Sequence, residues 1–189
     1  MRQPRARAAL RPFSLLAVCA AILLALSPAR AAETPLAGCY ERSYDARHLA
    51  AHRGQIVVRV RLKVERWTEQ PPFLANAPIE LWVRGRKQSF QSKGACKAEG
   101  EGLICNGSSS AEETDRCRTK ADGVRNCRIA DADSGRYHIA ARPEGVLVTI
   151  RERLELMETP DGGRYLYLSP DSVENRAFLL TAAPAGACK

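Results

Sequence analysis

Residues 58–65 alternate between apolar and charged side chains, and this alternation restricts the fold more than any other feature of the sequence. Valine or leucine stands at every even position and arginine, lysine or glutamate at every odd one. A period of two places alternate side chains on opposite faces of a β-strand. One face is then buried and the other is wet, which is typical of an antiparallel sheet. Ile79, Leu81 and Val83 repeat the pattern.

Short turns rich in glycine, proline and aspartate separate the remaining apolar stretches, so neighbouring strands are expected to be antiparallel. We predict eight to ten strands and one short helix, Ser43–Gly54, with Ser43 at its start and Gly54 at its end. The fold class is mainly β: an up-and-down barrel or a two-layer sandwich. Besides two cysteine hairpins, the later strands are expected at Lys87–Ser92, Arg136–Ala141, Val146–Leu156, Tyr165–Leu168 and Ala177–Thr181.

The N-terminus has the order of a secretory signal peptide. Four arginines precede a 12-residue apolar run, Leu15–Leu26, and a small-residue A-x-A site follows at 29–31. A membrane span needs about 20 apolar residues, so the run is too short to be one. We therefore predict a cleaved signal at residues 1–31 and one domain at 32–189, with no membrane span after cleavage.

Removing the signal changes the charge balance. The whole chain has 29 basic and 21 acidic residues, but five of the arginines lie in residues 1–31. The mature chain keeps 24 basic and 21 acidic residues. The high isoelectric point therefore belongs mainly to the signal, and nucleic-acid binding is not expected.

Six cysteines remain after cleavage, and an even number in an exported chain predicts three disulfides. Cys96 and Cys105 flank a Gly100-Glu101 turn and fall opposite each other in the resulting hairpin. Cys117 and Cys127 are symmetric about a three-residue loop. Cys39 is then left to pair with Cys188, which favours the barrel because the pair ties the first strand to the last. The spacings match no zinc site, and no motif indicates a metal or a cofactor.

Candidate site residues are few. His48 and His52 lie four residues apart on the expected helix and can share a face with Asp45, an arrangement suited to acid–base chemistry or to part of a metal site. Without a further ligand in view, the alternative is an exposed helix with ordinary polar residues. Glu152 falls at an inward position between Ile150 and Leu154, so it is either a buried carboxylate or turned outward by a bulge.

Trp82 alternates out of phase with the apolar residues of its strand and is expected on the outer face, beside Glu80 and Arg84. An outward tryptophan can anchor a partner. The alternative is that a neighbouring segment covers the ring.

The signal and the disulfides place the protein in an oxidising compartment, the periplasm or the exterior of a bacterial cell. In general plan the predicted domain resembles calycin-like barrels, such as lipocalins and periplasmic lysozyme inhibitors. That resemblance is architectural and rests on strand number and disulfides. It implies a non-enzymatic binding protein that holds a small ligand in the barrel mouth or an envelope protein on its loops. The alternatives are a hydrolase acting on the envelope and a structural or assembly factor.

Overall fold

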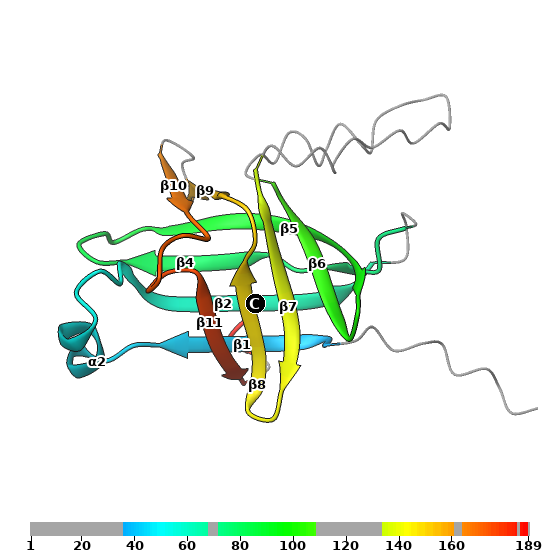
Figure 1. The fold of residues 1–189 in the computed structure, drawn as a ribbon, viewed down its shortest axis with the longest axis horizontal. Coiled ribbons are helices and arrows are strands. Elements are labelled where there is room, and N and C mark those ends of the chain that lie inside the picture. Colours follow the sequence, from blue (N-terminus) through cyan, green and yellow to red (C-terminus); the bar gives the residue numbers. More distant parts are fainter. Residues whose placement is uncertain (1–35, 68–71, 109–133, 161–163, 185, 189) are drawn as a thin grey trace, which may run out of the picture. The chain divides into compact units, whose positions relative to one another are not determined.

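The computed structural model describes residues 36–67, 72–108, 134–160, 164–184 and 186–188, all within one compact unit (Figure 1). This part of the chain contains the helix α2 (Ala46–Ala51) and eleven strands. The strands are β1 (Gly38–Ser43), β2 (Val57–Arg66), β3 (Ala75–Asn76), β4 (Ile79–Val83), β5 (Ser89–Glu99), β6 (Gly102–Ser108), β7 (Arg136–Arg142), β8 (Gly145–Ile150), β9 (Leu154–Glu158), β10 (Tyr165–Leu168) and β11 (Ala177–Ala182).

The strands close into an eight-stranded antiparallel barrel. Neighbours follow the order β1, β2, β4, β5, β6, β7, β8 and β11, and β11 pairs with β1 again. The short β3 continues the position of β4, because both strands pair with β2 and β5. Sequential strands are thus neighbours around the ring. The predicted up-and-down barrel is confirmed, and the sandwich alternative is wrong.

A hairpin of β9 and β10 is inserted between β8 and β11, outside the eight-stranded ring. β9 pairs with the start of β5 at Phe90 and Gln91, and with β10 on its other side. The rest of β5, from Lys93 onward, pairs with β6. One edge of β5 therefore pairs with two strands in succession, first with β9 and then with β6.

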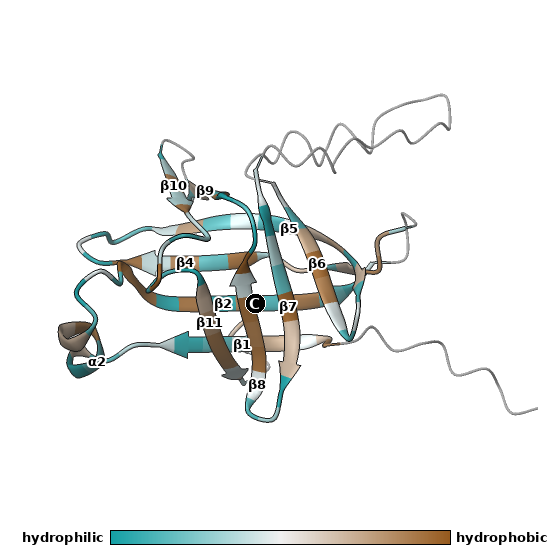
Figure 2. Cartoon of the chain, in the orientation of Figure 1, coloured by the Kyte–Doolittle hydropathy of each residue, from teal (hydrophilic) through white to brown (hydrophobic). Residues whose placement is uncertain are grey.

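Polar and apolar residues alternate along the strands of the barrel (Figure 2). The apolar side chains point inward and fill the barrel. The inward residues of β2, β4, β7, β8 and β11 belong to a single packed cluster. An eight-stranded barrel is just wide enough for side chains to fill it. The largest fully buried side chains of the described residues include three from the β9–β10 hairpin, and they are Tyr137, Phe178, Leu62, Ile79, Leu81, Leu103, Ile139, Ile150, Leu154, Leu156, Leu168 and Leu180.

Two of the three predicted disulfides lie in the described residues. Cys96 and Cys105 pair across the β5–β6 hairpin, with Glu99 opposite Gly102 at the turn, as the count from the turn predicted. Cys39 is joined to Cys188 across 149 positions of sequence, next to the β1–β11 pairing. The predicted Cys117–Cys127 bond lies outside the described residues.

The expected helix is shorter than the sequence suggested. It spans Ala46–Ala51, and its start is capped by Asp45, whose carboxylate accepts a hydrogen bond from the His48 amide at 2.7 Å. The predicted cap, Ser43, is instead the last residue of β1 and pairs with Arg59. The strand continues that far because its pairing with β2 holds the backbone extended.

Two further expectations are corrected by irregularities of the strands. The register of β2 against β4 shifts between Val57 and Arg59, so Val57 is buried and the predicted Val58 is only half-buried. The predicted strand Val146–Leu156 breaks after Ile150. There the amides of two successive residues, 151 and 152, donate to the same carbonyl, that of Arg136, at 2.9 and 3.1 Å.

Candidate functional site

The outer wall of the barrel carries a hollow of about 250 Å³ over β2, β4 and β5. Polar and apolar groups share its lining, and both signs of charge are present. The residues around it are Arg61, Lys63, Pro78, Glu80, Gln91 and Cys188.

Strand register brings the polar lining together. Arg61 pairs with Glu80 across β2 and β4, and Glu80 pairs with Gln91 across β4 and β5. Side chains directly opposite on neighbouring strands lie on the same face, about 5 Å apart. Their inward neighbours Leu62, Leu81 and Phe90 are buried, which fixes these three polar residues outward. Three adjacent strands thus present one row of hydrogen-bonding groups to solvent.

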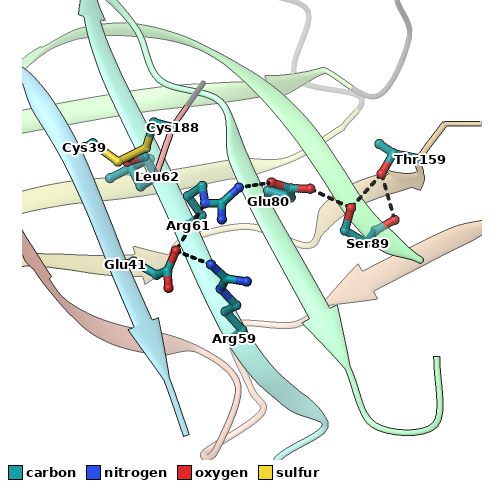
Figure 3. Close-up of polar contacts among 9 residues, drawn as sticks. All are labelled: Cys39, Glu41, Arg59, Arg61, Leu62, Glu80, Ser89, Thr159 and Cys188. Carbon is teal, nitrogen blue, oxygen red and sulfur yellow. Dashed lines mark hydrogen bonds and ion pairs between the residues drawn. A yellow bond between two sulfur atoms is a disulfide. The ribbon is translucent and has the colours of Figure 1, made fainter. Parts of the chain in front are cut away.

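Glu41 of β1 joins two arginines of β2 beside the hollow (Figure 3). Its Oε2 atom lies 2.6 Å from Nη2 of Arg59 and 3.2 Å from Nε of Arg61. The hydrogen bond from Arg59 is the main cause that lowers the pKa of Glu41, and Arg61 adds to it against the opposing effect of burial. Glu41 therefore stays ionised at neutral pH. Its carboxylate holds the guanidinium groups of Arg59 and Arg61 on the outer face of β1 and β2.

Glu80 extends these contacts to the far side of the hollow (Figure 3). One carboxylate oxygen lies 3.4 Å from Nη1 of Arg61, and the other accepts a 2.6 Å hydrogen bond from the Ser89 hydroxyl. The hydroxyls of Ser89 and Thr159 are also 2.6 Å apart. A chain of polar contacts therefore runs from β1 across β2 and β4 to the residue that follows β9.

Trp82 lies on the same outer face and is half-buried. The guanidinium carbons of Arg59 and Arg61 lie 4.6 and 5.1 Å from its ring centroid, within the range of a cation–π contact. The sequence left open whether a neighbouring segment covers the Trp82 ring. Two arginines of the neighbouring strand β2 do so. Nε of Arg59 is buried there without a hydrogen-bond partner among the described residues.

Of the predicted histidines, His48 lies on α2 and His52 caps its end, and neither lines the hollow. His48 and His52 stack with centroids 4.3 Å apart. Nε2 of His48 is 3.0 Å from the Gln55 side chain, and Nδ1 of His52 is 3.4 Å from Glu174. Asp45 is engaged as the helix cap. These contacts give the pair a structural explanation, and no group of three or more metal-binding side chains is found in the part of the chain that the structure covers.

Glu152 points outward, as the bulge alternative supposed. Its side chain is 47% exposed and lies 3.5 Å from Nη1 of Arg136. The break that follows Ile150 turns it away from the core. Glu152 and the two histidines have different partners, so the described structure does not gather the three into one catalytic cluster.

Sequence reasoning missed the central members of the site, Glu41, Arg59, Arg61 and Glu80. A signal was present, since the charged face of residues 58–65 and the outward Trp82 were both recognised. What the sequence did not supply was the register that brings β1, β2 and β4 into line.

Comparison with protein-family models, with curated proteins and with solved structures found no match. In the described residues, no helix has the length and apolar character that crossing a membrane requires.

Proposed function

We propose that this chain is an exported, non-enzymatic binding protein that holds a carboxylate-bearing ligand in the hollow on its outer wall. The observation that carries the proposal is the placement of two cationic side chains, Arg61 and Lys63, on the rim of a hollow framed by three adjacent strands. Arginine and lysine form strong charge-assisted hydrogen bonds with carboxylates. The hollow, about 250 Å³, equals the space of roughly eight liquid waters, enough for a small ligand or for one carboxylate side chain of an envelope protein.

The barrel interior is a less suitable site. Its described residues form a packed apolar cluster with exposures close to zero. A ligand in the interior would have to displace this core, whereas a ligand on the wall displaces only water. We therefore keep the binding role expected from the sequence as a proposal, and place the ligand on the outer wall rather than in the barrel mouth.

Binding at the hollow can be tested with acetate as the probe and neutral acetamide as its matched control. We expect acetate, at constant ionic strength, to shift the amide NMR signals of Arg61, Lys63 and Gln91, and acetamide to leave them in place. Lys63→Gln should weaken the acetate shifts, because it removes one of the two cations of the hollow. The fold should be spared, since within the described residues the ion-pair partner of Lys63 is the exposed Glu65. Arg142→Gln, at the exposed end of β7, serves as the charge-matched control.

Equal shifts with acetate and acetamide would contradict a carboxylate site. The same conclusion would follow if Lys63→Gln and Arg142→Gln bound acetate as well as the unaltered protein does.

Export is the second part of the proposal. Two disulfides in the described residues are compatible with an oxidising compartment. We expect the intact mass of protein isolated from its own cell envelope to correspond to a chain that begins near Ala32. Six cysteines paired in three disulfides would make that mass six hydrogens lower than the mass of the reduced chain. A retained N-terminus, or a free thiol, would contradict the export or the pairing.

A further inference from the structure

The strand β10 ends the sheet. It pairs with β9 over four residues, and no strand of the described chain pairs with its other edge. An open edge leaves a row of backbone donors and acceptors free to pair with another chain. β9 is itself fixed to β5 at Phe90 and Gln91, so the edge is held in place by the barrel.

The side chains of β10 divide cleanly between the two faces. Leu168 is buried and Leu166 packs against the core, which fixes the strand on the barrel. Tyr165 and Tyr167 point outward and are 52% and 44% exposed. Natural sheets usually guard an edge with charged residues, proline or a bulge. Tyr165–Leu168 contains no charge and no proline, so only the shortness of this four-residue strand limits pairing at its edge.

We propose that a second copy of this chain pairs with β10, strand to strand and antiparallel, about a two-fold axis at Leu166. That register places Tyr165 opposite the partner's Tyr167, and the symmetry repeats the pair. Cross-strand aromatic pairs stabilise antiparallel sheets, and a two-fold interface needs such a self-complementary surface. An unrelated extended peptide would gain the backbone hydrogen bonds but not both aromatic pairs, so a second copy suits this edge better.

The charges near the edge are compatible with that pairing. The guanidinium of Arg153 lies 4.0 Å from the ring centroid of Tyr167, and Glu155 accepts a hydrogen bond from the Tyr167 hydroxyl. Arg164, just before the strand, falls opposite the partner's Leu168 in this register. Like charges are therefore not brought directly opposite one another.

The dimer is expected to be weak. β10 has four residues, and so short a contact buries less than the roughly 1,200 Å² typical of a stable interface. Association should therefore depend strongly on concentration, with a dissociation constant between about 1 µM and about 1 mM. This inference concerns a different surface from the hollow and does not rest on the function proposed above.

Sedimentation equilibrium of the exported protein, from about 1 µM to about 1 mM, tests the proposal. We expect monomer at the low end and dimer at the high end. Tyr167→Lys should raise the dissociation constant at least about tenfold by placing a charge on the edge. Val173→Lys, at a side chain 77% exposed on another segment, should leave it unchanged.

Hydrogen exchange of the unaltered protein provides a measurement that does not depend on the folding of a variant. The amides of β10 that face away from β9 should exchange more slowly at high concentration than at low concentration. A monomer over the whole range would overturn the proposal. So would a dimer in which β10 gains no protection and Tyr167→Lys has no effect.

Discussion

At the scale of single residues, Tyr137 shows how a polar group is accommodated in the barrel. The residue is fully buried, and its hydroxyl donates a hydrogen bond to the Ala77 carbonyl. Burial raises the pKa of Tyr137, so the hydroxyl stays protonated and remains a donor at neutral pH. Tyr137→Phe leaves a buried carbonyl without its partner, and we expect the free energy of unfolding in urea to fall by about 1–3 kcal/mol.

The matched control is Tyr165→Phe, because the Tyr165 ring is 52% exposed. Its free energy of unfolding should change by less than about 0.5 kcal/mol. Similar losses in the two variants would show that the buried hydrogen bond contributes nothing of its own.

Glu41 makes the stability of the outer wall depend on pH. Hydrogen bonds from Arg59 and Arg61 hold its pKa below the ordinary value of 4.5. The unfolded chain therefore binds more protons than the folded chain between those two pKa values, and stability rises with pH through that window. The contribution is complete above pH 4.5 and is lost as the pH falls through the folded-state pKa. Glu41→Gln should thus flatten the acid side of a plot of unfolding free energy against pH.

Glu144→Gln, in an exposed turn, is the control for removing one carboxylate. If its plot flattens as much as that of Glu41→Gln, the two arginines do not hold the Glu41 carboxylate in the way described.

At the scale of elements, the break between β8 and β9 depends on close packing against a glycine. Gly135 has a φ of +81°, and a Cβ atom there would lie 2.0 Å from the Arg153 carbonyl oxygen. Gly85 has a similar φ of +70° but nothing within 4 Å. We expect Gly85→Ala to lower the free energy of unfolding by about 1 kcal/mol, the cost of the left-handed backbone. Gly135→Ala should lose about 1–3 kcal/mol more, because the backbone of the break must move.

Thermal unfolding of both variants measures the difference. Equal losses at the two glycines would mean that the backbone of the β8–β9 break can move without lowering the free energy of unfolding. The close packing at Gly135 would then not fix the position of the β9–β10 hairpin.

The elements that the sequence predicted are those in which local pattern and tertiary structure agree. Ile79, Leu81 and Val83 are all buried, and the Cys96–Cys105 hairpin has the predicted register. The errors come from irregularities without a local signature. The bulge at Val58 and the break after Ile150 depend on what the neighbouring strands do.

The candidate site was only partly predictable for the same reason. Its charged residues were visible as an outer face, and Trp82 was singled out. The ion pairs of Glu41 with Arg59 and Arg61 join strands that are fixed by register rather than by local sequence. The predicted histidines instead stack on each other, and His48 contacts the side chain of the nearby Gln55.

At the scale of the whole molecule, the barrel closes where β1 meets β11. The register there includes two pairs, Tyr40 with Ala182 and Glu41 with Thr181, against six pairs between β1 and β2. The Cys39–Cys188 disulfide lies beside this short pairing and joins residues 149 positions apart. The chain-entropy model assigns so long a closure about 5 kcal/mol, against about 2.7 kcal/mol for a nine-residue separation.

Replacing both Cys39 and Cys188 by alanine should therefore lower the free energy of unfolding by up to about 5 kcal/mol. Because the missing bond lies at the closure, hydrogen exchange should speed up first in β1 and β11, while β7 and β8 change later. Replacing Cys96 and Cys105 by alanine is the control, since that bond lies within a long hairpin. Its loss should leave the exchange of β1 and β11 nearly as in the unaltered protein. If the two double variants loosened the same strands, the barrel would be held closed by its core, and the terminal disulfide would not be what fastens the first strand to the last.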